Sequence, residues 1–338
     1  MNNVALQYRQ LLEPSDELLK DIAKIDGDIM VLGAGGKMGP ALAILAKKAC
    51  LKAGVDKKIY AVSRFSDPEA RAELVAEGIE TIAADLMEET DLAALPDVKN
   101  ILFLAGTKFG TKGKESYTWA INSYLPGRVA QKFPGSNIVV FSTGNVYHLT
   151  PLNMGGASER YVPLPFGEYA QSCLGRERVF QHFSSKNNTP ILIYRLNYAN
   201  DVTYGVLLEI AKSVKAGRAI DLQMGNVNVI WQGDANEMAI RSLLHCNVPG
   251  KLLNITGPET VSVRWVAEEF GRMFGVQPVF ENEEQPTSLL SNAAEAFRLF
   301  GYPRTPLLKI MELLTGWINE GGKIINKETH FQERKGQF

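Results

Sequence analysis

Short apolar segments alternate with amphipathic segments through the first 196 residues of the chain. Each apolar segment ends near a glycine, serine or aspartate, as buried strands do where they meet a turn. Because strands that are apolar on both faces and alternate with helices form parallel sheets covered on both sides, this pattern predicts a doubly wound α/β fold. The six expected strands are residues 28–33, 57–63, 80–85, 100–106, 137–144 and 190–196.

Helix start signals agree with this pattern. Ser15 is expected to cap a short helix near the N-terminus, because its hydroxyl can accept a bond from a free backbone N–H of the first turn. Asp67 followed by Pro68 is a second start signal, since proline fits the first helical position.

The alternation of strand-like and helical segments becomes less regular after about residue 197, and the pattern of the remaining residues predicts a smaller lobe. The final twelve residues, KETHFQERKGQF, are polar and aromatic, and we expect them to pack across the pocket or against a neighbouring molecule. The expected divisions are an N-terminal helical extension over 1–27, a Rossmann domain over 28–198 completed by about 228–246, and a C-terminal α/β substrate-binding lobe over 199–338.

Composition narrows the class of protein. Charged residues make up 22% of the chain and the net charge is −1, so no charge excess indicates nucleic acid or a membrane surface as a partner. The 3 cysteines and 4 histidines show no metal-ligand spacing. The first residues lack a basic segment followed by an apolar run, which argues against a secretory signal. These features predict a cytoplasmic protein with a small-molecule substrate and no metal.

A glycine-rich loop, LGAGGKMGP at 32–40, joins the first expected strand to a long expected helix. Glycines three residues apart let the backbone turn tightly and approach a pyrophosphate, which then lies at the positive end of the helix. A tight turn without a ligand is the alternative. The candidate dinucleotide-binding residues of this loop are Gly33, Gly35, Gly36, Lys37, Met38 and Gly39.

The end of the second strand bears on the choice between NAD and NADP. Ser63 and Arg64 stand there, and the first carboxylate is Asp67. An acidic residue would bind the ribose hydroxyls, whereas an arginine suits a 2′-phosphate, so the sequence favours NADP, with NAD as the alternative. Arg64 can equally be a solvated surface residue. Asp85, at the end of the third strand, either accepts a bond from an adenine amino group or caps the following turn.

Several motifs occur in an order that resembles the extended short-chain dehydrogenase/reductases of the NAD-dependent epimerase/dehydratase family, over roughly residues 29–320. They are GAGGKMG after the first strand, FSTGNVY at 141–147, PFGEYAQS at 165–172, VIWQGDANEMAI at 229–240 and NITGPETVSV at 254–263. The resemblance implies that Thr143 polarises the substrate and that Tyr169 transfers a proton. It also implies cofactor contacts from Asp85, Leu86, Leu104, Ala105, Gly106, Asn122 and Asn197, and a homodimer paired through the helices at 114–133 and 167–186.

Cys173 departs from the pattern of this family. It follows Tyr169 by four residues in GEYAQSCLGRE, where the family has a lysine that bonds the nicotinamide ribose and lowers the pKa of the tyrosine. A free tyrosine has a pKa near ~10 and is a poor base at neutral pH, and a neutral thiol does not correct this. Arg176 lies about two turns after the tyrosine and is either a replacement for the lysine or a surface charge beside Glu177. No histidine is expected on the face of Cys173, so a structural thiol is favoured over a nucleophile.

A second departure concerns the substrate. Residues 219–240 contain no lysine or arginine, and Val227 stands about where the family has an arginine for a sugar nucleotide's diphosphate. A diphosphate without a cation binds poorly. We therefore expect an NAD(P)-dependent oxidoreductase of the epimerase/dehydratase type acting on a sugar, sugar acid or related hydroxy or keto compound rather than a nucleotide-diphosphate sugar. The alternative is a non-catalytic NAD(P)-binding regulatory or scaffold protein.

Overall fold

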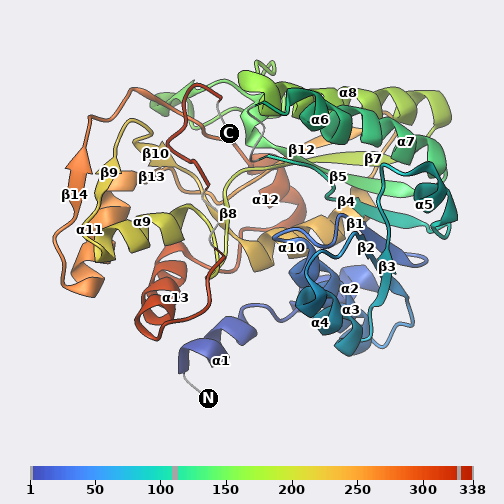
Figure 1. Ribbon diagram of the computed structural model, residues 1–338, viewed down its shortest axis with the longest axis horizontal. Coiled ribbons are helices and arrows are strands. Elements are labelled where there is room, and N and C mark those ends of the chain that lie inside the picture. Colours follow the sequence, from blue (N-terminus) through green and yellow to red (C-terminus); the bar gives the residue numbers. More distant parts are fainter. Residues whose placement is uncertain (1–2, 109–112, 326–328, 337–338) are drawn as a thin grey trace.

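A seven-stranded parallel sheet forms the centre of the molecule in a computed structural model, which describes residues 3–108, 113–325 and 329–336 (Figure 1). The strand order is β12-β7-β5-β4-β1-β2-β3. This arrangement confirms the predicted doubly wound α/β fold. The strands are β1 (Ile29–Leu32), β2 (Ile59–Ser63), β3 (Glu80–Ala83), β4 (Asn100–Phe103), β5 (Asn137–Thr143), β7 (Ile191–Leu196) and β12 (Lys251–Ile255).

Helices cover both faces of the sheet (Figure 1). Successive side chains of β1 enter opposite cores: Ile29 and Val31 belong to one apolar cluster, and Met30 and Leu32 belong to the other. The first face carries α2 (Asp16–Ile22), α3 (Gly39–Ala53), α10 (Gln232–Arg241) and α12 (Ala294–Phe300), with α4 (Pro68–Ala76) beside α3. The second face carries α5 (Glu89–Ala94), α6 (Glu115–Trp119), α7 (Leu125–Lys132) and α8 (Gly167–Asn187).

The two predicted helix starts are present. The Ser15 hydroxyl accepts a bond from the backbone N–H of Leu18, at the start of α2. The Asp67 carboxylate accepts bonds from the backbone N–H groups of the first turn of α4, and Pro68 occupies the first helical position. Local polar residues therefore set these boundaries, as the sequence predicted.

The second lobe has its own apolar core, in which Phe270 and Trp231 are fully buried. β12 lies within the later part of the chain but pairs with β7 of the main sheet, so the chain crosses back from the lobe. The lobe contains α9 (Val206–Lys215), α11 (Val263–Phe274), α13 (Leu307–Asn319), β9 (Ala219–Asp221), β10 (Asn226–Val227), β13 (Val261–Ser262), β14 (Val279–Glu281) and β15 (Thr287–Ser288).

The short α1 (Asn3–Gln10) packs against α13 and lies apart from the sheet (Figure 1). Two further short strands, β8 (Ala199–Asn200) and β11 (Ile230–Trp231), pair with each other where the two lobes meet. Within the described part of the chain, no helix combines the length and apolar character that a membrane span requires.

Candidate functional site

A groove runs along the carboxyl ends of the parallel strands. It consists of an inner cavity of about 340 Å³ and an outer cavity of about 410 Å³. Gly33, Gly36, Leu104 and Gly106 line both cavities, so the two are neighbouring parts of one groove. Ligands of open α/β sheets bind at this edge of the sheet.

The glycine loop packs against neighbouring backbone more closely than side chains would allow. Gly33 has φ +88°, and a Cβ added to it would lie 2.6 Å from the backbone nitrogen of Ala105. A Cβ added to Gly39 would lie 2.6 Å from the Cα of Ala34, because α3 begins there against the loop. The glycines therefore allow the tight turn that brings the loop and the N-terminus of α3 to the inner cavity, an arrangement that fits the pyrophosphate of a dinucleotide.

The remaining residues predicted for this loop also reach the groove. Lys37 and Met38 line the inner cavity, whereas Gly35 lines the outer one. Lys37 places its ammonium 5.1 Å from the centroid of the Tyr204 ring. The loop thus offers one cation to the inner cavity.

The outer cavity has a polar end beyond β2. Ser63, Arg64, Asp85 and Leu86 line it, together with Ala105. Arg64 is exposed, and its guanidinium lies 3.9 Å from the Asp85 carboxylate, which makes a weak surface pair. Asp85 also accepts a bond of 3.0 Å from a backbone N–H two residues later, so it caps the following turn as the alternative interpretation proposed.

Asn122 holds the loop after β4 in place. It is fully buried in the short π-helical segment between α6 and α7. Its amide donates to the carbonyl of Thr107 at 2.9 Å and to the hydroxyl of Ser172 at 3.0 Å, and it accepts from the N–H of Thr107 at 3.0 Å. These bonds tie the loop to α8 and leave the asparagine itself inside the protein.

Thr143, Tyr169 and Asn197 all line the inner cavity. Burial raises the pKa of the Tyr169 phenol well above its ordinary value, and nearby Cys173 raises it further. The charge of Arg176 and a hydrogen bond with Thr143 act in the opposite direction. The balance leaves the phenol protonated, so its use as a base requires additional positive charge.

Cys173 is buried in a small apolar cluster with Val146, Tyr147 and Ala157. Burial raises the pKa of its thiol, so the thiol form is favoured over the nucleophilic thiolate. The residue fills space on the inner face of α8, in agreement with its interpretation as a structural thiol.

Arg176 is buried, so its interpretation as a surface charge is wrong. One guanidinium nitrogen donates to the carbonyl of Phe141 at 2.7 Å and another to the amide oxygen of Asn122 at 2.8 Å. A Cβ added to Gly106 would collide with this guanidinium, which therefore lies directly behind the wall of the groove. Glu177 does not pair with Arg176 and instead forms a buried ion pair of 2.6 Å with Arg195.

Lys108 is the residue that the motifs did not reveal. Its ammonium lies 5.6 Å from the centroid of the Tyr169 ring, and the side chain lines the inner cavity. Burial and the charge of Lys37 lower the pKa of Lys108 to about 8. The only signal in the sequence was its place two residues after Gly106, in the loop that follows a strand already expected to reach the cofactor.

The described part of the C-terminal segment, residues 329–336, contacts the inner cavity and the second lobe. Thr329 lines the inner cavity and bonds Glu209 of α9, and Phe331 is buried in the core of the second lobe. Arg334 donates to the carbonyls of Gln223 and Thr287, each at 2.8 Å. The expectation for the last twelve residues can be followed over 329–336, because 327, 328, 337 and 338 lie outside the described residues: Thr329 reaches the pocket as expected. Arg334 brings a cation to residues 219–240, which contain no lysine or arginine.

No protein-family model matches the sequence, and no curated protein matches it. Solved structures do match. UDP-glucuronic acid 4-epimerase from Bacillus cereus in complex with NAD has a TM-score of 0.72 at 19% identity, over 88% of this chain and 100% of that chain. UDP-glucose 4-epimerase from Thermus thermophilus with NAD has a TM-score of 0.71 at 15% identity, over 86% and 99%. UDP-glucose 4-epimerase from Thermotoga maritima with UDP-glucose has a TM-score of 0.70 at 13% identity, over 87% and 99%.

These matches correct one prediction. The expectation of a substrate other than a nucleotide-diphosphate sugar is wrong, because the similar structures are enzymes of UDP-sugars. That expectation considered only cations within residues 219–240. Arg334, near the end of the chain, bonds Gln223 and so brings a cation to this segment. The resemblance given by the motifs is confirmed in the architecture: the chain has the fold of the extended short-chain dehydrogenase/reductases that include the NAD-dependent 4-epimerases.

Proposed function

We propose that the protein is a nicotinamide-dinucleotide-dependent enzyme that acts at a hydroxyl or ketone carbon of a nucleotide-diphosphate sugar. The observation that carries the proposal is the shared cavity: Thr143, Tyr169 and Lys108 line the same space as the glycine loop. A proton-transfer group, a hydrogen-bonding hydroxyl and a cation thus stand beside a backbone that fits a dinucleotide.

A nicotinamide bound in the groove would supply the hydride acceptor or donor. The chain's own part is the handling of the proton. In this proposal the Tyr169 oxygen takes the proton from the substrate hydroxyl or returns it, and the Thr143 hydroxyl bonds the same substrate oxygen. The ammonium of Lys108 stabilises the phenolate that forms, which is the role that a lysine at the position of Cys173 has in the family. Arg176 supports the same charge from behind the wall of the groove.

For the cofactor we propose NADP as the preferred form. The end of β2 offers Ser63 and Arg64 and has no carboxylate that would bind the ribose hydroxyls. Arg64 is exposed and its contact with Asp85 is long, so little energy is lost when it turns to a 2′-phosphate. The similar Bacillus cereus and Thermus thermophilus structures contain NAD, so a direct comparison of the affinities for NADP and NAD is the measurement that decides.

For the substrate we propose that Arg334 provides the cation for the diphosphate. The half-buried guanidinium lies against the segment around Gln223 and Met224 and lines a small cavity that shares Asn145 with the inner cavity. Burial lowers the pKa of Arg334, which is nevertheless an arginine and keeps its charge at neutral pH. A charged guanidinium that is partly removed from water binds phosphate strongly.

Homodimerisation through the second face of the sheet is part of the proposal. Three aromatic side chains, Tyr117, Trp119 and Tyr124, are exposed on the segment from α6 to α7, and α8 lies beside it. Exposed aromatic residues on neighbouring helices are typical of interfaces. Sedimentation of the full chain at micromolar concentration checks this, and a monomer at all concentrations contradicts it.

The alternative is a non-catalytic dinucleotide-binding protein, and one observation favours it. Burial raises the pKa of Tyr169, and the residue four positions later is a neutral thiol. A protein that has kept the groove and lost acid–base chemistry would bind the dinucleotide without turnover.

The test is a titration of the purified protein with NADP and NAD, followed by nucleotide-sugar turnover. Fluorescence of the reduced dinucleotides gives both dissociation constants, and the proposal expects the smaller value for NADP. A panel of UDP-, dTDP- and GDP-linked sugars is then followed by chromatography for an epimerised, oxidised or dehydrated product. Tight dinucleotide binding without any product across the panel supports the non-catalytic alternative, and absence of dinucleotide binding contradicts both proposals.

A further inference from the structure

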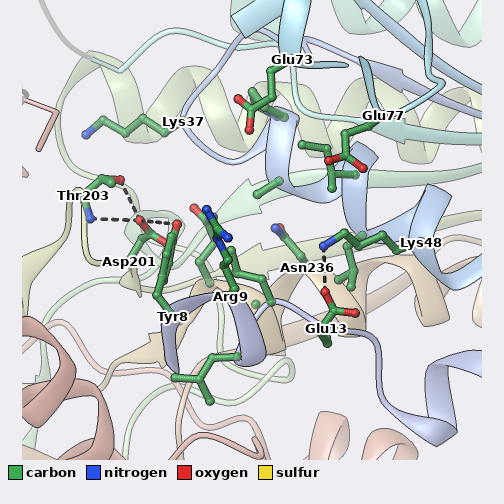
Figure 2. Close-up of a pocket in the computed structure, with 18 of the residues that line it drawn as sticks. Tyr8, Arg9, Glu13, Lys37, Lys48, Glu73, Glu77, Asp201, Thr203 and Asn236 are labelled. Carbon is green, nitrogen blue, oxygen red and sulfur yellow. Dashed lines mark hydrogen bonds and ion pairs between the residues drawn. The ribbon is translucent and has the colours of Figure 1, made fainter. Parts of the chain in front are cut away.

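A third cavity, of about 670 Å³, lies behind the glycine loop (Figure 2). It is bounded by α1, by the first half of α3, by α4 and α10, and by the loop at 201–203. Lys37 lines both this cavity and the inner part of the groove, and the other lining residues are different. The volume lies in the range of small-molecule sites. We call it the rear cavity.

Asn236 of α10 lines the rear cavity and is 1% exposed. Neither its amide nitrogen nor its amide oxygen has a hydrogen-bond partner among the residues that the structure describes. Buried side-chain amides are almost always hydrogen-bonded, because an unpaired one has lost its bonds to water without compensation. An unpaired donor and acceptor on the wall of a cavity therefore indicate a ligand that supplies the missing partners.

Two groups of polar side chains around the rear cavity have partners already (Figure 2). The Asp201 carboxylate accepts bonds from the Tyr8 hydroxyl at 3.1 Å and from the Thr203 hydroxyl at 2.7 Å. Lys48 pairs with Glu13 at 2.8 Å. Asn236 differs from these groups, because its hydrogen-bonding capacity is left for a molecule that enters the cavity.

Charges of both signs surround the rear cavity. Glu73 and Glu77 lie one turn apart on α4, and within the described parts of the chain neither carboxylate forms an ion pair. Arg9 and Lys37 line the same cavity (Figure 2). A ligand with charge of a single sign would meet like charges, whereas a molecule with both signs can place each one beside its opposite.

We propose that the rear cavity binds a small zwitterionic metabolite, an amino acid or short peptide, that carries an ammonium group and a carboxylate. Its ammonium lies toward Glu73 and Glu77 and its carboxylate toward Arg9 and Lys37. An amide or hydroxyl of the ligand pairs with the Asn236 amide, which can donate and accept at once. This site is separate from the proposed enzymatic function, and its test uses binding and not turnover.

The experiment compares three probes of nearly equal size on the full-length protein. L-glutamine carries both charges and a primary amide, glutaramate lacks the ammonium, and 4-aminobutanamide lacks the carboxylate. The other common amino acids and glycine-containing dipeptides complete the panel. Thermal unfolding finds the best zwitterion and calorimetry measures its affinity. We expect at least one zwitterion to raise the unfolding temperature, and its single-charge analogues to bind tenfold or more weakly.

Two variants locate the site. Asn236→Leu should leave the unfolding temperature of the ligand-free protein unchanged or higher, because it removes an unpaired buried amide, and should abolish the response to the ligand. Glu73→Gln with Glu77→Gln changes only exposed residues and should weaken zwitterion binding, whereas Glu69→Gln on the same helix should not. The proposal is overturned if no zwitterion binds, or if wild type and Asn236→Leu bind equally. A large loss of stability in ligand-free Asn236→Leu would also overturn it, by giving the amide a structural role.

Discussion

The two ends of the groove are built in different ways. At the dinucleotide end, residues 33–39 are contiguous, and the absence of side chains shapes the surface. At the catalytic end, Lys108, Thr143, Tyr169 and Thr329 come from four separate parts of the chain. The dinucleotide end depends on backbone geometry, whereas the proposed catalytic end depends on charged and polar side chains that the fold brings together. Because a cation can reach Tyr169 from another loop, the proposed proton transfer does not require a lysine at the position of Cys173.

Tyr169→Phe should have the largest effect, because it should abolish turnover and leave dinucleotide binding unchanged. Loss of the phenolic hydroxyl removes the proposed proton transfer, which is worth roughly 10²–10⁴-fold in rate. The fold and the dinucleotide groove should stay intact, because the ring still fills its place in the cavity. Steady-state turnover and a fluorescence titration of the reduced dinucleotide measure the two effects. Undiminished turnover in this variant would remove Tyr169 from the mechanism.

Lys108→Met tests whether a cation from another loop replaces the family lysine. Because the pKa of Lys108 is about 8, its ammonium is present below that pH and is lost as the pH rises through it. Wild-type turnover should therefore fall above about pH 8. Below about pH 8, Lys108→Met should be slower by about 10–100-fold for a lost charge-assisted interaction, and the difference should narrow as the pH rises above 8. Lys108→Arg keeps the charge and should retain activity with the alkaline fall displaced upward. Equal pH–rate profiles for wild type and Lys108→Arg would contradict this role.

Arg176→Ala should act mainly on stability. The change removes the buried donor to the carbonyl of Phe141 and one of the two donors to the amide oxygen of Asn122, which keeps its bond from the N–H of Thr107. An unsatisfied buried group costs about 1–3 kcal/mol, so urea unfolding should show a loss of this size. Arg176 also lowers the pKa of Tyr169, so a small alkaline shift of the pH–rate profile accompanies the loss. A large shift with unchanged stability would make Arg176, and not Lys108, the main replacement for the lysine.

Gly39→Ala perturbs the dinucleotide end alone. The added methyl group would lie 2.6 Å from the Cα of Ala34, so the loop or α3 must move. Overpacking of this kind costs about 1–3 kcal/mol, and the displaced loop should bind the dinucleotide more weakly. Gly135→Ala is the matched control, since its added Cβ meets no atom within 4 Å among the residues described. Unfolding temperature and dinucleotide affinity are measured for both. Equal affinities would show that the loop does not hold the dinucleotide.

Features that depend on neighbouring residues were predicted from the sequence, and features that depend on distant residues were not. The alternating pattern gave six of the sheet's seven strands, and Ser15 and Asp67 cap helices as expected, because these signals act between near neighbours. The last strand, β12, was not assigned to the sheet, since the chain reaches it only after crossing the second lobe. Lys108 and Arg334 were missed for the same reason: their neighbours in space, Tyr169 and Gln223, are far away in sequence.

Arg334→Met is the mildest of these changes and addresses the residue whose position was hardest to foresee. A guanidinium that contacts only the bound substrate's diphosphate contributes equally before and during the reaction, so its loss should raise KM with kcat nearly unchanged. Loss of one charge-assisted contact corresponds to about a tenfold rise in KM for a nucleotide-diphosphate sugar, or ~1.4 kcal/mol. Arg334→Lys keeps the charge and should show a smaller rise in KM. If KM is unchanged in both variants, Arg334 only anchors the C-terminal segment through Thr287, and the diphosphate must find its cation elsewhere.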